Sequence, residues 1–253
     1  MMANMSHPQT FEIELVDRTI MGTMSMPMAE LQVQQPGIPG TLICHSPKLS
    51  EDESQLIDAL VESLVGAGIA VVVYLTQRNN DSPIPTATQD AVDDASAAFR
   101  WMALHESIDL SRLYMVGYAQ GAVPASCLAR RTDQLAGLCL LTPTPVFDAL
   151  LSNGNGEKQT QTTVKGPLTP IKDAAYFDRP TLILFAASDK VIPFTESCIY
   201  LNALEAMDHK VEHLIIARAD HAFTGETARR LCLEKITRFF ENAPAVIGAE
   251  ISQ

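Results

Sequence analysis

The chain has little positive charge and no run of apolar residues long enough to cross a membrane. Lys and Arg number 18 against 30 Asp and Glu, which gives a net charge of −12. Nucleic-acid binding requires clustered basic side chains against the phosphates, so this balance argues against a nucleic-acid partner and indicates a soluble protein. Since no apolar run approaches the roughly 20 residues of a membrane-spanning helix, no membrane partner is expected either.

Paired-cysteine motifs and targeting signals are also missing. The five cysteines are odd in number, lie within apolar segments and form no Cys-x-x-Cys pair. This pattern indicates neither a zinc site nor a disulfide framework, so we expect no metal and mostly buried, reduced thiols. Residues 1–7 lack the basic region and apolar run of a signal peptide. These features predict a cytoplasmic protein, and no motif indicates a cofactor.

The remaining pattern predicts an α/β fold. At 253 residues the chain can form one domain with a full core, so we expect a single domain over 1–253. Alternating apolar residues over 11–16 and 19–26 predict an N-terminal antiparallel hairpin. Further along, apolar segments alternate with helical patterns, which predicts a doubly wound, mostly parallel sheet with helices on both faces. The strands of that sheet are expected at 41–45, 69–75, 111–118, 136–142, 181–186 and 211–217.

Three segments are assigned more closely. Ser50 with Glu53 three residues later is typical of a helix start, and Gly66 and Gly68 mark the end of the same helix. The run 69–75 is apolar on both faces and is expected to be a central parallel strand. The interval 143–179 interrupts the alternation, so a long loop or minimal flap is expected there, with disorder over 152–165.

The chemistry-bearing segment is a short apolar strand that leads into Gly117-x-Ala119-x-Gly121. The pattern Gly-x-Ser-x-Gly holds a serine nucleophile on a tight turn between a strand and a helix, and its glycines leave room for that turn. Here the central residue is Ala119, whose methyl group cannot attack a carbonyl. Ser126 and Cys127 lie about two turns into the next helix, too deep to replace the missing hydroxyl.

Two more motifs follow strands downstream of this turn. Ser188-Asp189-Lys-Val-Ile-Pro193 comes after the strand 181–186, and Asp220-His221-Ala-Phe223 comes after the strand 211–217. With Gly117-x-Ala119-x-Gly121, these motifs resemble the α/β-hydrolase superfamily in its dienelactone hydrolase-like and small esterase branch, over about residues 38–240. The resemblance implies that Asp189 is the acid, His221 the general base and Ala119 the nucleophile position. Asp220, adjacent to His221, is expected to be solvated and to have no catalytic part.

The same resemblance implies an oxyanion hole. The amide of Gln120 would supply one donor, and the amide of Ser46 is the candidate for the second. Where the family often carries His-Gly, this chain has His45-Ser46-Pro47, and a proline has no amide hydrogen. The second donor is therefore open. His45 and Tyr118 are the candidate substrate-binding residues.

Three functions are compatible with these residues. The first is a hydrolase of carboxylic esters or related small acyl compounds, inactive or nearly so as written because Ala119 was introduced by design or arose by loss of the serine. The second is a natural non-catalytic relative that binds a small molecule or a partner. The third is proton abstraction by a His221–Asp189 dyad without a covalent nucleophile. The intact Asp189 and His221 favour the first function, and Pro47 favours the second.

The C-terminal tail 243–248 is apolar. We expect it to pack either on a second copy, which would give a homodimer, or on the chain's own surface.

Overall fold

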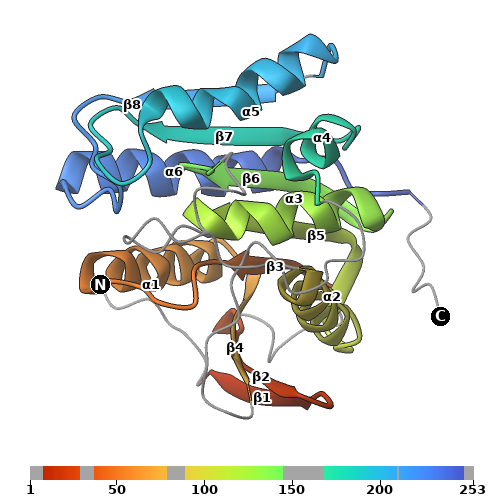
Figure 1. Cartoon of the computed structure of the whole chain (residues 1–253). Coiled ribbons are helices and arrows are strands. Elements are labelled where there is room, and N and C mark those ends of the chain that lie inside the picture. Colours follow the sequence, from red (N-terminus) through yellow and green to blue (C-terminus); the bar gives the residue numbers. More distant parts are fainter. Residues whose placement is uncertain (1–7, 29–36, 79–88, 145–167, 210, 248–253) are drawn as a thin grey trace.

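The structure, a computed structural model, describes residues 8–28, 37–78, 89–144, 168–209 and 211–247. These residues form an eight-stranded sheet in the order β1-β2-β4-β3-β5-β6-β7-β8 (Figure 1). The strands are β1 Gln9–Glu14, β2 Arg18–Ser25, β3 Ile38–Cys44, β4 Ala70–Arg78, β5 Ile108–Tyr118, β6 Leu135–Leu141, β7 Thr181–Ala186 and β8 Val211–Ile216. From β4 onward through β8 every neighbouring pair is parallel. The predicted doubly wound, mostly parallel sheet is confirmed.

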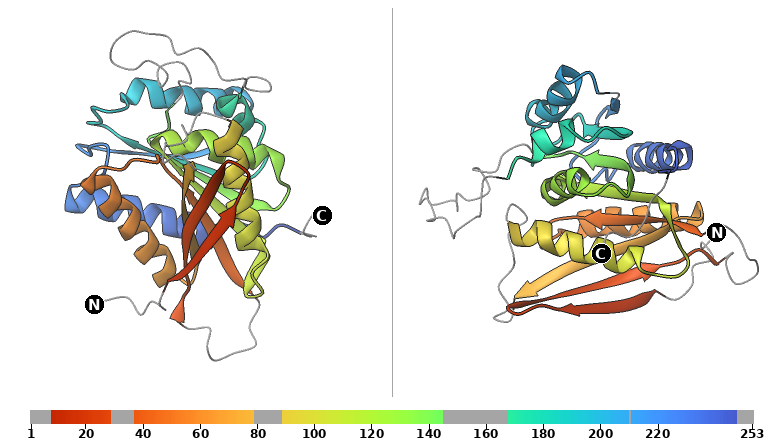
Figure 2. Two further views of the ribbon diagram at one scale, coloured as in Figure 1. Left: turned by 60° about the horizontal axis from the view of Figure 1, so that its bottom comes forward. Right: turned by 90° about the vertical axis from the view of Figure 1, so that its right-hand side faces the viewer.

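Helices cover both faces of the sheet. The helices are α1 Glu51–Gly66, α2 Gln89–Ala103, α3 Ala122–Arg131, α4 Pro170–Ala175, α5 Phe194–Ala206 and α6 Glu226–Asn242. Helices α1 and α6 lie side by side on one face, and α2 and α3 lie on the other (Figure 2). One buried cluster lies beneath each group, joining Leu56 to Phe240 on the first face and Phe99 to Tyr200 on the second. Burial of these two apolar layers is the main driving force for the fold.

The N-terminal hairpin forms as predicted, and its position corrects the assignment of the strand after it. β1 and β2 pair antiparallel, and β2 then pairs antiparallel with β4. The run 69–75 is therefore not a central parallel strand, because β4 is parallel to β3 on one edge and antiparallel to β2 on the other. Its carboxyl-terminal half is less buried than a central strand would be, with Leu75 40% exposed.

Helix α1 begins with the predicted capping box. The Ser50 side chain accepts a hydrogen bond from the Glu53 amide, and the Glu53 carboxylate accepts one from the Ser50 amide. Acidic residues fill the first turn, where they stabilise the positive end of the helix dipole. The helix ends at Gly66, and Gly68 adopts the left-handed φ of +83° that glycine favours after a helix.

The interval 143–179 is not a loop throughout. Helix α4 lies within it and packs between α3 and α5. Pro170 at the first turn explains this helix start, since proline is well tolerated there. The expected disorder over 152–165 lies outside the described residues.

The cysteines and the tail can also be placed. Cys44, Cys127, Cys139 and Cys232 are buried free thiols, and Cys198 is half-buried. Burial raises the pKa of the Cys44 thiol to about 12, so it remains protonated at neutral pH. The tail packs on the chain's own surface at Val246, which is buried and whose amide donates to the Ser111 carbonyl, 2.7 Å away.

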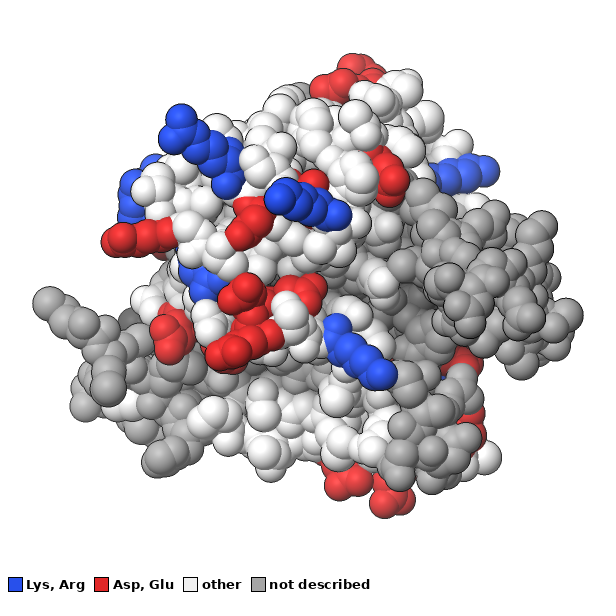
Figure 3. All heavy atoms as spheres, turned by 60° about the vertical axis from the view of Figure 1, so that its left-hand side comes forward, with Lys and Arg blue, Asp and Glu red and all other residues white. Residues whose placement is uncertain are grey.

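The surface reflects the negative net charge. Acidic side chains gather near the middle of the face seen in Figure 3, with Lys and Arg placed around them. Among the described residues, no helix is long and apolar enough to traverse a bilayer.

Candidate active site

The site is built on the turn that follows β5. Strand β5 ends at Tyr118, a single 3-10 turn covers Ala119–Gly121, and α3 begins at Ala122. Ala119 has a φ of 51°, a left-handed conformation that is uncommon for a residue with a side chain. Its carbonyl accepts a hydrogen bond from the Thr144 amide beyond β6 (3.3 Å). The predicted tight strand-to-helix turn is therefore present, with its strained residue at 119.

Both glycines of the motif are required because the surrounding backbone leaves no room for a Cβ atom. A Cβ on Gly121 would lie 2.0 Å from the carbonyl oxygen of Cys44, at the end of β3. A Cβ on Gly117 would lie 2.7 Å from the Cα of Ala122. No side-chain atom fits at these distances, so the backbone of the turn packs directly against the backbone of β3 and α3.

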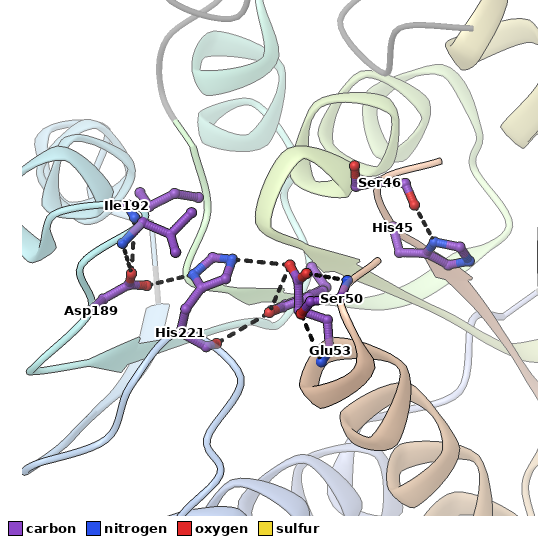
Figure 4. A network of polar contacts seen from close by, with 9 residues as sticks. His45, Ser46, Ser50, Glu53, Asp189, Ile192 and His221 are labelled. Atoms are coloured by element: carbon purple, nitrogen blue, oxygen red, sulfur yellow. Dashed lines mark hydrogen bonds and ion pairs between the residues drawn. The ribbon is translucent and has the colours of Figure 1, made fainter. Parts of the chain in front are cut away.

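Asp189 is held in the loop between β7 and α5. One carboxylate oxygen, Oδ1, accepts hydrogen bonds from the amides of Val191 (2.8 Å) and Ile192 (2.9 Å). The other oxygen, Oδ2, lies 2.7 Å from Nδ1 of His221. The Asp189 side chain is only 1% exposed. Its carboxylate is thus fixed on one side by the backbone and turned toward the imidazole on the other (Figure 4).

His221 sits in the loop between β8 and α6, and its ring is 8% exposed. Asp220 accepts hydrogen bonds from the amide and hydroxyl of Thr224, which closes the loop. Burial would raise the pKa of Asp220, but the bonds from Thr224 outweigh it and lower that pKa. The Arg229 guanidinium, on α6, donates to the carbonyls of Ala222 (3.1 Å) and Phe223 (3.2 Å). The Asp220 carboxylate is thus bonded to Thr224 within its own loop. Its exclusion from catalysis stays a prediction.

Tyr118 contributes to the site from inside the core. Its side chain is fully buried, and its hydroxyl donates to the His221 carbonyl (3.2 Å) and lies 3.5 Å from Oε1 of Glu53. Burial, reinforced by the Glu53 carboxylate, raises the pKa of Tyr118, so the hydroxyl remains a donor. With no exposed surface, this side chain supports the histidine loop, and the predicted substrate contact is not available to it.

Glu53 is a site residue that sequence reasoning assigned only to helix capping. Its Oε1 lies 3.5 Å from Nε2 of His221, while Oε2 accepts the hydrogen bond from the Ser50 amide (2.7 Å). Figure 4 shows Asp189 and Glu53 on opposite sides of the imidazole. The Ser-x-x-Glu spacing gave the helix start but could not show that the capped end of α1 faces the loop after β8.

Two of the predicted residues, His45 and Ser46, lie on the side of the turn away from His221 (Figure 4). His45 follows β3, its Nδ1 lies 2.6 Å from the Ser46 carbonyl oxygen, and its ring points away from His221 (Figure 4). Burial lowers the pKa of His45. His45 and Pro47 line a small cavity of about 30 Å³ together with Asp94. Gln120 is half-buried in the turn itself. The assignment of the Gln120 and Ser46 amides to an oxyanion hole stays a prediction.

This arrangement suits proton transfer and acyl transfer. An imidazole oriented by a buried carboxylate at Nδ1 can take a proton at Nε2 from a hydroxyl on the adjacent turn. Among the described residues, no group of three His, Cys, Asp or Glu side chains could hold a metal ion.

Comparison with protein families agrees with these motifs. Residues 84–245 match the model of the prolyl oligopeptidase family, a stretch that covers more than half of the chain. It contains the turn at Ala119 together with Asp189 and His221. No curated protein sequence matches the chain significantly.

Solved structures of similar fold include esterases and peptidases. Est1E from Butyrivibrio proteoclasticus is 17% identical, has a TM-score of 0.69, and is matched over 92% of this chain and 97% of its own. A protein from Klebsiella pneumoniae described as a dienelactone hydrolase is also 17% identical, with a TM-score of 0.67 and coverage of 94% and 100%. The acylaminoacyl peptidase of Pyrococcus horikoshii is 15% identical, with a TM-score of 0.69 over 97% of this chain.

The match to the peptidase covers 43% of its length, so this chain spans less than half of that protein. These likenesses show the α/β-hydrolase fold, which confirms the resemblance of the sequence to that superfamily.

The close contact between the backbone of the turn and the end of β3 can be tested at Gly121. Gly121→Ala should lower the free energy of unfolding by about 3 kcal/mol, because the new methyl group collides with the Cys44 carbonyl. Gly66→Ala is the matched control, since a Cβ there meets no atom within 4 Å. It should raise stability by about 0.5–1 kcal/mol. Urea denaturation measures both, and equal effects at the two sites would contradict the close approach.

The support that Tyr118 gives to the histidine loop can be tested separately. Tyr118→Phe should lower the free energy of unfolding by about 1–3 kcal/mol, because the buried His221 carbonyl loses its donor. Tyr176→Phe removes the hydroxyl of a tyrosine that is 47% exposed and should change stability by less than about 0.5 kcal/mol. Thermal or urea unfolding of the two variants gives the comparison. An unchanged free energy of unfolding in Tyr118→Phe would show that this hydrogen bond does not stabilise the fold.

Proposed function

The chain belongs to the prolyl oligopeptidase family, and so is an α/β-hydrolase of the serine esterase or peptidase type. From this premise we propose that it carries an acyl-transfer site in which alanine occupies the position of the nucleophile. The substrates proposed for that site are carboxylic esters or related small acyl compounds. As written, with Ala119 at the turn, the chain forms no acyl-enzyme and is inactive or nearly so.

The observation that carries this proposal is the 2.7 Å contact between Asp189 and His221 beside a strained turn at residue 119. A carboxylate that is 1% exposed and turned toward Nδ1 orients an imidazole as a general base. The φ of 51° at Ala119 is the strained conformation that presents a nucleophile. A pocket that only bound a ligand would need neither feature.

With a serine at 119, the reaction follows from these positions. Nε2 of His221 takes the hydroxyl proton while the oxygen attacks the acyl carbon, and the imidazole then returns that proton to the leaving group. Water clears the acyl-enzyme by the same exchange. The Gln120 amide, next along the turn, is the proposed oxyanion donor. One of the similar structures, of Est1E, holds ferulic acid, and this carboxylic acid supports the choice of acyl compounds.

The second candidate is a non-catalytic relative that uses the same pocket to bind a small molecule. Two residues favour it. Pro47 has no amide hydrogen to offer an oxyanion, and the Glu53 carboxylate faces the nitrogen that a base would need free. The two candidates differ in what happens when a hydroxyl is placed at residue 119.

The test is Ala119→Ser, assayed with p-nitrophenyl acetate. The serine variant should hydrolyse the ester far faster than the parent, because loss of the nucleophile from a comparable triad lowers kcat by roughly a millionfold. Liberated nitrophenolate measures the rate, and an initial burst would report the acyl-enzyme.

Two controls separate the candidates. Ala119→Ser combined with His221→Gln should return the rate to the parent level. A serine variant no faster than the parent would reject the hydrolase proposal and favour binding, which a ligand that raises the melting temperature without being consumed would support. Turnover by the parent that disappears in His221→Gln would favour the proton-abstracting dyad.

A further inference from the structure

The imidazole of His221 has a carboxylate on both sides. Asp189 Oδ2 lies 2.7 Å from Nδ1, and Glu53 Oε1 lies 3.5 Å from Nε2. All three side chains are largely shielded from water, with exposed fractions of 1% for Asp189, 8% for His221 and 18% for Glu53. In the mechanism above, Nε2 is the atom that must accept a proton from the nucleophile, and Glu53 faces that atom.

The contacts limit where the protons can be. An ionised carboxylate only accepts hydrogen bonds, and a neutral imidazole has one N–H donor and one nitrogen lone pair. The short contact to Asp189 places the N–H on Nδ1. A neutral ring would then point its lone pair at the Glu53 oxygen, which is a repulsive contact. A proton between Nε2 and Glu53 turns the same contact into an attractive one, and an imidazole holds a proton more strongly than a carboxylate does.

The groups around the ring add to this effect. Glu53 comes from α1, Asp189 from the loop after β7, and Asp220 from the histidine's own loop. From β5 the Tyr118 hydroxyl supplies a neutral donor. The Arg229 guanidinium on α6 is bonded to backbone carbonyls of this loop rather than to either carboxylate flanking the ring. On the β3 side, burial lowers the pKa of His45, so this ring does not offset the acidic groups.

Glu53 is held in this position by a hydrogen bond from the backbone at the start of α1. Its Oε2 accepts from the Ser50 amide, so Oε1 is the oxygen left for the imidazole and for the Tyr118 hydroxyl. Helix α1 begins at Glu51, and the Arg229 guanidinium lies 3.5 Å from the Asp52 carbonyl, which joins the start of α1 to α6. The side chain is therefore placed beside His221 by the helix start and not by chance rotation.

We propose that Glu53 is a positioning residue that keeps a proton on Nε2 of His221 and so holds the imidazole in the form that cannot act as a base. Catalysis at this site requires that proton to leave, by neutralisation or displacement of the Glu53 carboxylate. This inference deepens the proposed function and rests on it for its catalytic consequence. The protonation of Nε2 itself does not depend on any activity.

The first measurement is made on the chain as it exists. Nitrogen NMR of protein labelled with ¹⁵N-histidine reports which ring nitrogens carry protons, with His221 identified by its loss in His221→Gln. At pH 7 the parent should show protons on both nitrogens. Glu53→Gln keeps an acceptor for the Ser50 amide and can donate its amide N–H to a free lone pair, so Nε2 should lose its proton.

Ser50→Ala is the matched control for this measurement. It removes the side-chain half of the capping box but leaves the backbone donor that holds the Glu53 carboxylate. Its His221 signals should match those of the parent. An unprotonated Nε2 in the parent, or signals unchanged by Glu53→Gln, would overturn the proposal.

The second measurement asks what the proton does to catalysis. At pH 7, Ala119→Ser with Glu53→Gln should have a kcat about tenfold above that of Ala119→Ser alone, with KM little changed, because a free base enters each turnover. Ala119→Ser with Ser50→Ala should equal Ala119→Ser. A lower kcat with Glu53→Gln would mean that the carboxylate assists the base and would overturn the proposal.

The two failures are distinguishable. If no serine variant exceeds the parent, the hydrolase proposal fails, while the NMR result still decides where the proton lies.

Discussion

The backbone at Gly121 passes so close to the carbonyl oxygen of Cys44 that a Cβ there would lie only 2.0 Å from it. This contact locks the turn after β5 onto the end of β3, and the other features of the site depend on it. Because the turn contacts the neighbouring strand, the chain must reverse direction sharply between β5 and α3. Ala119 adopts the strained backbone conformation that this requires, with a φ of 51°. Strand β3 also leads into the segment before α1, so the same contact relates the turn to the start of that helix.

The loops at the carboxyl ends of the parallel strands bring the charged groups to this turn. Parallel strands all end at one edge of a sheet, so the residues after β7 and β8 meet there although they are 32 positions apart. Asp189 is desolvated and has two backbone donors, which makes it a fixed partner for the imidazole. Glu53 reaches the opposite nitrogen from α1. The imidazole is thus oriented by one carboxylate and, in our account, restrained by another.

The sequence alone predicted much of this arrangement, for identifiable physical reasons. Short apolar strands alternating with helices predict a parallel sheet, and glycines that flank a turn predict a close backbone approach. Asp189 and His221 could be assigned because each follows a strand in the order that the superfamily uses. The antiparallel neighbour of β4 was missed, since a run of β-branched residues does not show which strand lies on each edge.

Residues whose role depends on contacts between distant segments were not predictable. Tyr118 adjoins the turn in sequence and was expected to touch a substrate, yet the strand directs it into the core beneath His221. Glu53 fits a local capping pattern so well that nothing in the sequence indicated a second partner 168 positions away. Helix α4 is only six residues long, and a polar segment precedes it in the sequence, so its short pattern gave little signal.

The proposed chemistry requires a hydroxyl at residue 119 to lie within reach of the His221 imidazole. Covalent labelling tests it most directly: Ala119→Ser treated with a fluorophosphonate and analysed by intact and peptide mass spectrometry. We expect one phosphonyl group per chain, on residue 119, and none on the parent or on a serine variant that also carries His221→Gln. A folded Ala119→Ser that takes up no label at residue 119 would contradict it.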